Sequence, residues 1–425
     1  MRVRIIVAII AGLTGAATMA QDTVEPNAAK ASWRAQSDGR YLAAADLLRG
    51  EAFDSTGKPK PGPAYQSWSE LQGLMTGEPA PNAPAPGDKP EPPDARDLAD
   101  LRGATATNAI SAVVAAARKT RIVILNEDHA VPRDRAFGLA VARALRPFGY
   151  DVLAAETFSN KPDDAQVATQ MAALSRDGYI RRSTGVYTRD PVFADFIRQS
   201  LALGYRTVAY ETTDYSRPVG EDWTVEVARR EQMQADYLVR RAVKAYPASK
   251  ILIYVGFDHA TEAPKPAGDK IVRWMATRLK AMTGIDPLTI DQTTLNSYGH
   301  GSRLLYAAVA DRIGTRPAVL TRDGKPIVVG QFRGLVDLQV AHPATTRIGG
   351  RPDWLVAMGR VPTPIPATLL PTQGTRLVQA FVADEAADAV PVDQVLVTAG
   401  QPAPMLMLPK VPVRYAVQDS MTAAK

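Results

Sequence analysis

Four short apolar runs, separated by segments with helical spacing, constrain the fold of this chain most strongly. The runs cover residues 122–125, 151–155, 206–210 and 251–255, and each has the length of a buried strand. The segments between them, which include 165–174, 192–203 and 225–245, place apolar residues on one face of a helix. This alternation predicts βαβ units, and therefore an α/β fold with a mostly parallel sheet flanked by helices.

The sequence divides into further segments on either side of this core, which we place at 105–314. We expect residues 21–104 to form a helix over 27–52 and then a proline-rich strap, which has seven prolines in the fifteen residues 79–93. Residues 315–425 contain short β-branched runs punctuated by Pro and Gly. They predict a β-rich C-terminal domain, which is either a small sandwich or an extension of the first sheet.

The first twenty residues have the pattern of a secretory signal peptide. Arg2 and Arg4 precede an apolar stretch over 5–17, and small residues at 18–20 resemble a cleavage site. We therefore expect an exported protein, periplasmic or secreted, with no transmembrane segment after cleavage. The apolar stretch is short for a spanning helix, and an uncleaved anchor is the alternative.

Composition excludes several kinds of chemistry. The chain has no cysteine, which excludes disulfides, thiol catalysis and thiolate-bound metal centres. Its net charge of +6 over 425 residues is mild, and its Lys and Arg are scattered among acids. A nucleic-acid partner is therefore not expected. A small molecule or a peptide is the expected substrate, and the sequence leaves the oligomeric state open.

Acidic residues and histidines follow the four predicted strands in a paired pattern. The first and fourth strands lead into Asp-His-Ala, and the second and third lead from Gly-Tyr into Glu-Thr. The exits of parallel strands meet at one edge of a sheet, where ligands bind. We therefore expect a single site that gathers five side chains: Glu127, His129, Glu156, Glu211 and His259.

Each of these residues also has a structural interpretation. A lone carboxylate at a strand end can cap the next helix, but two of only four histidines at equivalent strand exits favour a functional cluster. Other polar residues are expected to serve the structure: Asp128 and Asp258 in their loops, and His300 and His342 at the surface or in the core. Residues 183–189 could form a lid or a surface turn. Arg135, Arg229, Arg230 and Glu231 could reach the cluster or lie on solvated helix faces.

These motifs resemble the haem-binding uptake/Tiki superfamily, which includes ChaN-like proteins, TraB-type proteins and erythromycin esterases. The resemblance covers residues 108–292 and rests on Asn126-Glu127-Asp128-His129, on the strands that end at Glu156 and Glu211, and on Gly256-Phe257-Asp258-His259. Asn126 replaces the family's first Gly. The resemblance implies a metal-dependent protease, an esterase that activates water, or a haem-binding protein, although no cysteine follows the leader to carry a lipid.

Two schemes of hydrolysis suit this residue set. A divalent metal (Mn, Co, Zn or Fe) could be bound by His129, His259, Glu127 and Glu156, and would activate water. Without a metal, an imidazole oriented by a glutamate could take a proton from water as it attacks a carboxylic ester or amide. The alternatives are a protein that binds haem or another small ligand without turnover, and a structural envelope module with a relict cluster.

Overall fold

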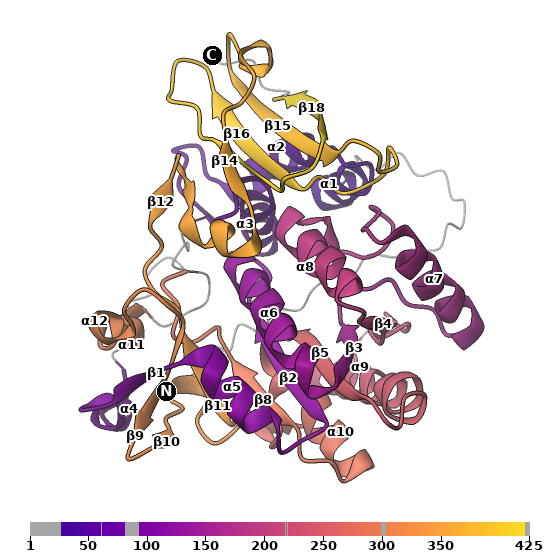
Figure 1. Ribbon diagram of the computed structural model, residues 1–425, viewed down its shortest axis with the longest axis vertical. Coiled ribbons are helices and arrows are strands. Elements are labelled where there is room, and N and C mark those ends of the chain that lie inside the picture. The colour runs from indigo at the N-terminus through magenta and orange to yellow at the C-terminus, as the bar shows by residue number, and fades with distance from the viewer. Residues whose placement is uncertain are drawn as a thin grey trace.

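A nine-stranded sheet forms the centre of the molecule (Figure 1). The computed structural model describes residues 27–60, 62–80, 93–216, 218, 220–298 and 303–420, so the predicted leader, most of the proline-rich interval and His300 lie outside the described residues. Six neighbouring strands run parallel in the order β4 (Arg206–Ala209), β3 (Tyr150–Ala155), β5 (Lys250–Gly256), β2 (Ile122–Glu127), β8 (Leu288–Asp291) and β11 (Leu338–Ala341). This order confirms the predicted α/β fold with a mostly parallel sheet.

Three antiparallel strands extend this sheet beyond β11. They are β9 (Ala318–Arg322), β1 (Thr105–Asn108) and β10 (Lys325–Pro326). Strands β9, β10 and β11 follow the boundary expected at residue 314, yet they pair within the main sheet. These three strands therefore extend the first sheet, which is one of the two arrangements expected for this part of the chain.

Helices cover both faces of the sheet because successive strand residues point to opposite sides. On β2, Val123 and Leu125 face one hydrophobic cluster, and Ile122 and Ile124 face the other. The first face is covered by α5 (Ala109–Ala117), α6 (Pro132–Leu145), α7 (Asp164–Asp177) and α8 (Pro191–Ala202). The second is covered by α9 (Trp223–Leu238), its π-helical continuation η3 (Val239–Lys244) and α10 (Met275–Thr283).

The end of the chain forms a smaller antiparallel sheet of three strands, β16 (Asp393–Thr398), β15 (Thr375–Val382) and β18 (Val413–Asp419), which is the β-rich region expected there. Strands β14 (Val361–Thr363) and β17 (Leu406–Leu408) pair beside it. The remaining short strands form two hairpins: β6 (Lys265–Ala267) with β7 (Lys270–Val272), and β12 (Arg347–Ile348) with β13 (Arg351–Pro352).

The first helices of the chain pack on this last sheet (Figure 1). They are α1 (Ala28–Ser37), α2 (Tyr41–Ala52) and α3 (Pro63–Thr76), so the helix expected over 27–52 is two helices that meet at a turn. Leu48 and Leu71 share one buried cluster with Leu377 of β15. Gln394 of β16 donates its side-chain amide to the carbonyl of Leu74 at 2.9 Å. The two ends of the described chain therefore form one packed unit.

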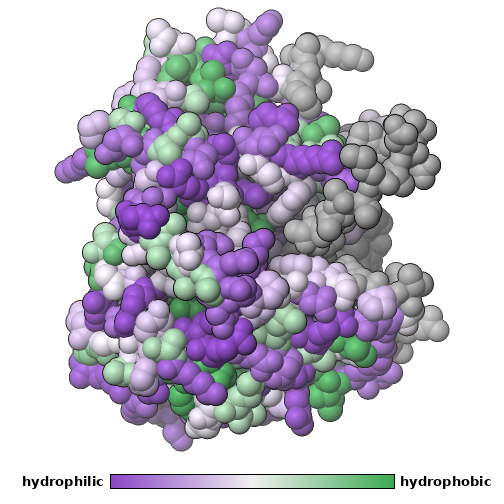
Figure 2. Space-filling model, turned by 90° about the vertical axis from the view of Figure 1, so that its right-hand side faces the viewer, coloured by the Kyte–Doolittle hydropathy of each residue, from purple (hydrophilic) through white to green (hydrophobic). Residues whose placement is uncertain are grey.

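Short helical segments complete the molecule. They are α4 (Ala95–Leu101), α11 (Arg303–Ala307), α12 (Ala310–Ile313), η1 (Arg146–Phe148), η2 (Tyr187–Arg189), η4 (Phe257–Ala260), η5 (Gly330–Phe332), η6 (Asp353–Met358) and η7 (Ala367–Leu369). Among the described residues, no helix is both long and apolar enough to span a bilayer. The coloured surface in Figure 2 is mostly hydrophilic, and its hydrophobic residues are scattered in small groups.

Candidate functional site

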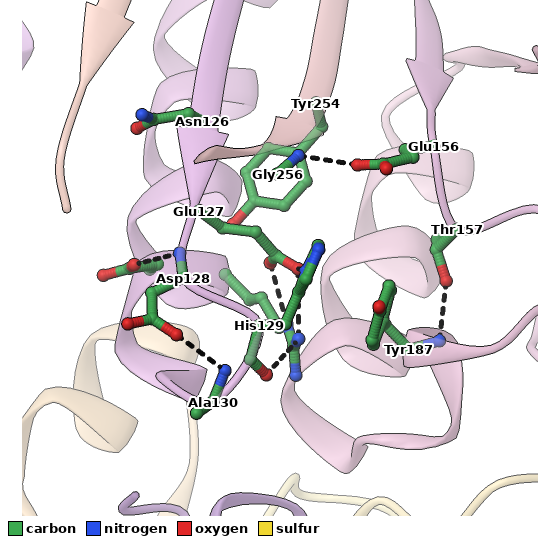
Figure 3. A network of polar contacts seen from close by, with 12 residues as sticks. Asn126, Glu127, Asp128, His129, Ala130, Glu156, Thr157, Tyr187, Tyr254 and Gly256 are labelled. Atoms are coloured by element: carbon green, nitrogen blue, oxygen red, sulfur yellow. Dashed lines mark hydrogen bonds and ion pairs between the residues drawn. The ribbon is translucent and has the colours of Figure 1, made fainter. Parts of the chain in front are cut away.

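The predicted residues follow the exits of β2, β3, β4 and β5 at one edge of the main sheet, and Figure 3 shows three of them, Glu127, His129 and Glu156. Glu127 is in register with Gly256 across the β2–β5 pair, and the amide of Glu156 donates to the carbonyl of Tyr254 at 3.1 Å. Strands β2, β3 and β5 therefore end at almost the same height in the sheet, and the side chains that follow them lie close together. The contacts below describe where each of the five predicted residues lies.

His129 is fixed by Glu127, which lies two residues before it. Nδ1 of His129 is 2.8 Å from Oε1 of Glu127, and Nε of Arg135 is 2.8 Å from Oε2 of the same carboxylate. All three side chains are buried. Burial alone would raise the pKa of Glu127, but the charge of Arg135 and the hydrogen bonds from His129 and Arg135 hold it below the ordinary value. An ionised Glu127 favours the His129 tautomer with its proton on Nδ1, which leaves Nε2 free to accept one.

His259 is fixed in the same way, but by a residue from another element. Its Nδ1 is 2.8 Å from Oε2 of Glu231 on α9, and the same oxygen accepts the amide of Met275 at 2.7 Å. Its Nε2 lies 3.4 Å from Oε1 of Glu156. Burial disfavours the charged imidazole, but Glu231 and Glu156 outweigh this effect and raise the pKa of His259.

Glu156 stands between the two imidazoles. Its Oε2 accepts the amide of Gly256 at 2.6 Å, and its Oε1 pairs with Nη2 of Arg230 at 2.6 Å. A Cβ atom at residue 256 would lie 2.5 Å from Nε2 of His129 and 3.2 Å from Oε2 of Glu156. Glycine is therefore required at position 256, because its missing side chain leaves room for Nε2 of His129 beside Glu156.

Glu211 is held at the rim of the cluster by α9. Oε1 of Glu211 accepts hydrogen bonds from Nε of Arg230 and from the side-chain amide of Gln234, both at 3.0 Å. Arg230 also bonds Glu156, so one guanidinium joins the two glutamates that follow β3 and β4. Burial opposes ionisation of Glu211, but the charge and hydrogen bonds of Arg230 outweigh it and lower the pKa of Glu211 to about 2.

The loop over residues 183–189 forms one wall of the site. The ring of Tyr187 stacks on that of His129, with centroids 3.9 Å apart and planes 11° from parallel. The hydroxyl of Thr157, just after β3, accepts the amides of Tyr187 at 2.8 Å and Thr188 at 3.1 Å (Figure 3). At Gly185 a Cβ would lie 2.3 Å from the carbonyl oxygen of Thr157. This loop is thus bound tightly to the strand exit and is not a detached surface turn.

The structure also places the residues whose role the sequence left open. Arg135 and Arg230 enter the cluster, where a solvated helix face was the other interpretation. Arg229 does remain at the edge, paired with Glu221. His342 is fully buried, 3.0 Å from Oε1 of Gln292, which is the structural role expected. Helical spacing places Arg230 and Glu231 on α9, but it does not reveal which carboxylates face that helix.

Asp190 was not anticipated as part of the cluster. It caps α8 by accepting the amide of Val192 at 2.9 Å, and it also pairs with Nη1 of Arg135. The sequence signal for it is the Asp-Pro pair at 190–191, which marks a helix start. That signal predicts a cap and gives no indication of a second contact with Arg135.

The geometry of the donors does not fit the predicted metal site. Both oxygens of Glu127 bond Arg135, and both oxygens of Glu156 are bonded, one by Arg230 and the other by the amide of Gly256. Within the part of the chain that the structure describes, no group of three or more acidic or His residues is arranged to hold a metal ion. The glutamates here neutralise arginines and orient imidazoles instead of offering oxygens to a metal ion.

Comparisons with known proteins reveal only distant similarity. No family model matches the sequence, and no curated protein matches it. Among solved structures, the type III effector HopBA1 aligns with 56% of this chain and 95% of its own, at 14% identity and a TM-score of 0.34. RRSP, a MARTX toxin effector domain from Vibrio vulnificus, aligns over 54% of this chain and 44% of its own, at 12% identity and a TM-score of 0.34. ChaN of Campylobacter jejuni, described with cofacial heme binding, aligns over 44% and 86%, at 9% identity and a TM-score of 0.29.

Proposed function

We propose that this protein hydrolyses a carboxylic ester or amide with a water molecule activated by histidine and without a metal. The observation that carries the proposal is the pair of carboxylate-oriented imidazoles around Glu156. Each histidine contacts a glutamate through Nδ1 at 2.8 Å, and Nε2 of each lies near Glu156. A carboxylate that fixes one ring nitrogen leaves the other ready to exchange a proton with a reactant.

The two histidines have different electrostatic surroundings, which suits opposite roles. In the proposed reaction, Nε2 of His129 takes a proton from water while the water oxygen attacks the carbonyl carbon. His259, whose pKa is raised by Glu231 and Glu156, donates a proton from Nε2 to the departing alkoxide or amine as the bond to the carbonyl carbon breaks. The products are a carboxylic acid and an alcohol or amine. Each histidine then returns to its starting state by exchange with solvent.

The remaining charged residues act as positioning groups in this scheme. Arg135 holds Glu127, and Arg230 holds Glu156 and Glu211, so the carboxylates do not swing toward the substrate. Preorganised charges of this kind lower the cost of reorganisation during the reaction. We also propose that the protein acts outside the cytoplasm, on the strength of the composition of residues 1–20 alone.

Turnover of a substrate panel tests the proposal. Purified protein is assayed with p-nitrophenyl esters and peptide p-nitroanilides before and after chelation. We expect activity to survive chelation, and His129→Ala to lower kcat by ~10²- to 10⁴-fold through loss of the general base. Glu127→Gln should lower kcat as well, because a neutral amide stabilises the imidazolium of His129 less well. Its matched control is Glu385→Gln, a largely buried carboxylate that pairs with Arg198 outside the cluster.

Two results would overturn the proposal: no turnover of any panel member, or activity that chelation abolishes and added metal restores. Binding of haem without turnover is the alternative drawn from the sequence. A saturable Soret shift with haemin that His259→Ala removes, together with inactivity on the panel, would favour that alternative.

A further inference from the structure

Helix α3 lies against the turn that carries His129, although it belongs to the first segment of the chain (Figure 1). At Gly73 of α3, a Cβ atom would be 2.6 Å from the carbonyl oxygen of Ala130 and 3.4 Å from Cδ of Pro132. The backbones therefore meet closely, and α3 is fixed directly beside the loop after β2. Any carboxylate on this face of α3 lies at the edge of the proposed active site.

Glu70 is that carboxylate. It precedes Gly73 by three residues, so the two positions share one face of the helix. Glu70 is partly exposed, and its one hydrogen bond in the described chain comes from the side-chain amide of Gln66 at 3.5 Å. No described Lys or Arg forms an ion pair with it, in contrast to Glu127, Glu156 and Glu211.

The charges of the site also act on Glu70. Burial raises the pKa of Glu70, whereas the charges of His129 and Arg135 lower it and that of Asp128 raises it further. Glu70 in turn contributes to raising the pKa of Tyr187, after the larger effect of burial. Glu70 therefore lies within electrostatic reach of both stacked rings, and an arriving cation would relieve the unfavourable burial of its carboxylate.

The whole cluster has more acids than bases, although the chain as a whole carries a positive net charge. Its six carboxylates are Glu70, Glu127, Glu156, Asp190, Glu211 and Glu231, and they face the guanidiniums of Arg135 and Arg230. Even with both imidazoles protonated, these six acids exceed the four bases. A site with this imbalance attracts cations and repels anionic substrates.

From this geometry we propose that Glu70 determines specificity by binding a cationic group, an ammonium or guanidinium, of the ester or amide that the site hydrolyses. The proposal rests on the proposed hydrolytic function and names its substrate class. Glu70 is the acid of the cluster with which no described Lys, Arg or His forms an ion pair, and it lies on the helix that borders His129. A charge-assisted hydrogen bond to this carboxylate would hold the substrate with its carbonyl next to the water that His129 activates.

Paired substrates test the specificity. The p-nitrophenyl esters of N-acyl lysine and N-acyl norleucine have closely similar side chains that differ in the ammonium group. We expect kcat/KM to favour the lysine ester by about tenfold or more, and Glu70→Gln to remove that preference while changing the norleucine value less than about twofold. The preference should also grow as pH rises through the pKa of Glu70. Glu78→Gln is the control, because Glu78 follows α3 and pairs with Arg347.

A binding measurement separates failure of this inference from failure of the proposed function. The imidazole NMR signals of the full chain are followed during titration with n-butylammonium and, separately, n-butanol. A saturable shift with the ammonium alone, lost in Glu70→Gln, supports the inference even if no ester is hydrolysed. Equal responses to both probes, or a lysine preference that Glu70→Gln leaves intact, would overturn the inference while hydrolysis itself could stand.

Discussion

His259 shows how neighbouring charges set the chemistry of a side chain. Its imidazole faces Glu231 and Arg230 from α9 and Glu156 from the exit of β3, and the two carboxylates raise its pKa against the effects of burial and of Arg230. A histidine of ordinary pKa, about 6.5, would be mostly neutral at pH 7.5. The raised pKa keeps more of the charged form, which is the form that can donate a proton to a leaving group.

Glu231→Gln should therefore change both the titration of His259 and the pH dependence of stability. The folded pKa lies above the unfolded one, so the stabilisation from this pair is complete below about pH 6.5 and is lost as pH rises through the folded pKa. We expect NMR titration to give a lower pKa for His259 in the variant, and unfolding in urea to show a smaller loss of stability over that window than in the wild type. An unchanged pKa for His259 would contradict this account.

At the scale of elements, the positions of the strands were predictable and their long-range partners were not. Parallel strands end at one edge by geometry, so Glu127, Glu156 and His259 could be placed together from the alternating pattern alone. Helical spacing predicts an apolar face on α9 but does not show which strand ends its polar residues reach, and this left Arg230 and Glu231 undecided. The approach of α3 to the site depends on Gly73, and a glycine within a helical pattern does not reveal which backbone it will meet.

The hydroxyl of Thr157 is one of the contacts that hold residues 183–189 in place, and Thr157→Val tests its contribution. The variant keeps the shape of the side chain but leaves the amides of Tyr187 and Thr188 without their acceptor. We expect the free energy of unfolding to fall by ~1–3 kcal/mol, with faster hydrogen exchange at these two amides. Thr169→Val, on the exposed face of α7, is the control and should leave exchange in the loop unchanged. Unaltered exchange at Tyr187 would mean that other contacts hold the loop.

At the scale of the whole molecule, the first three helices and the last sheet share a core that lies outside the main sheet. Leu48 of α2 and Leu377 of β15 are both fully buried in it, more than three hundred residues apart in sequence. The sequence predicted a docking helix and a β-rich end separately. It could not show that the two pack on each other, because an apolar face does not identify the surface that will cover it.

Leu48→Ala should loosen both ends of the chain together. Removing a fully buried leucine side chain lowers the free energy of unfolding by ~2–5 kcal/mol. This loss should affect the unit that contains α1 to α3 and the small sheet. We expect limited proteolysis to cut near the N-terminal helices and within β15 to β18 at similar rates. Leu98→Ala, at a position on α4 that is 38% exposed, provides the comparison. Cleavage confined to the N-terminal helices would show that the two ends unfold independently.

The position of Glu70 on α3 has a consequence for biosynthesis. A ribosome makes α3 early, but β15, on which this helix packs, emerges about three hundred residues later. A nascent protein can thus assemble its histidines and glutamates long before α3 is anchored beside them. Discrimination among substrates would then be acquired only after the hydrolytic residues have assembled.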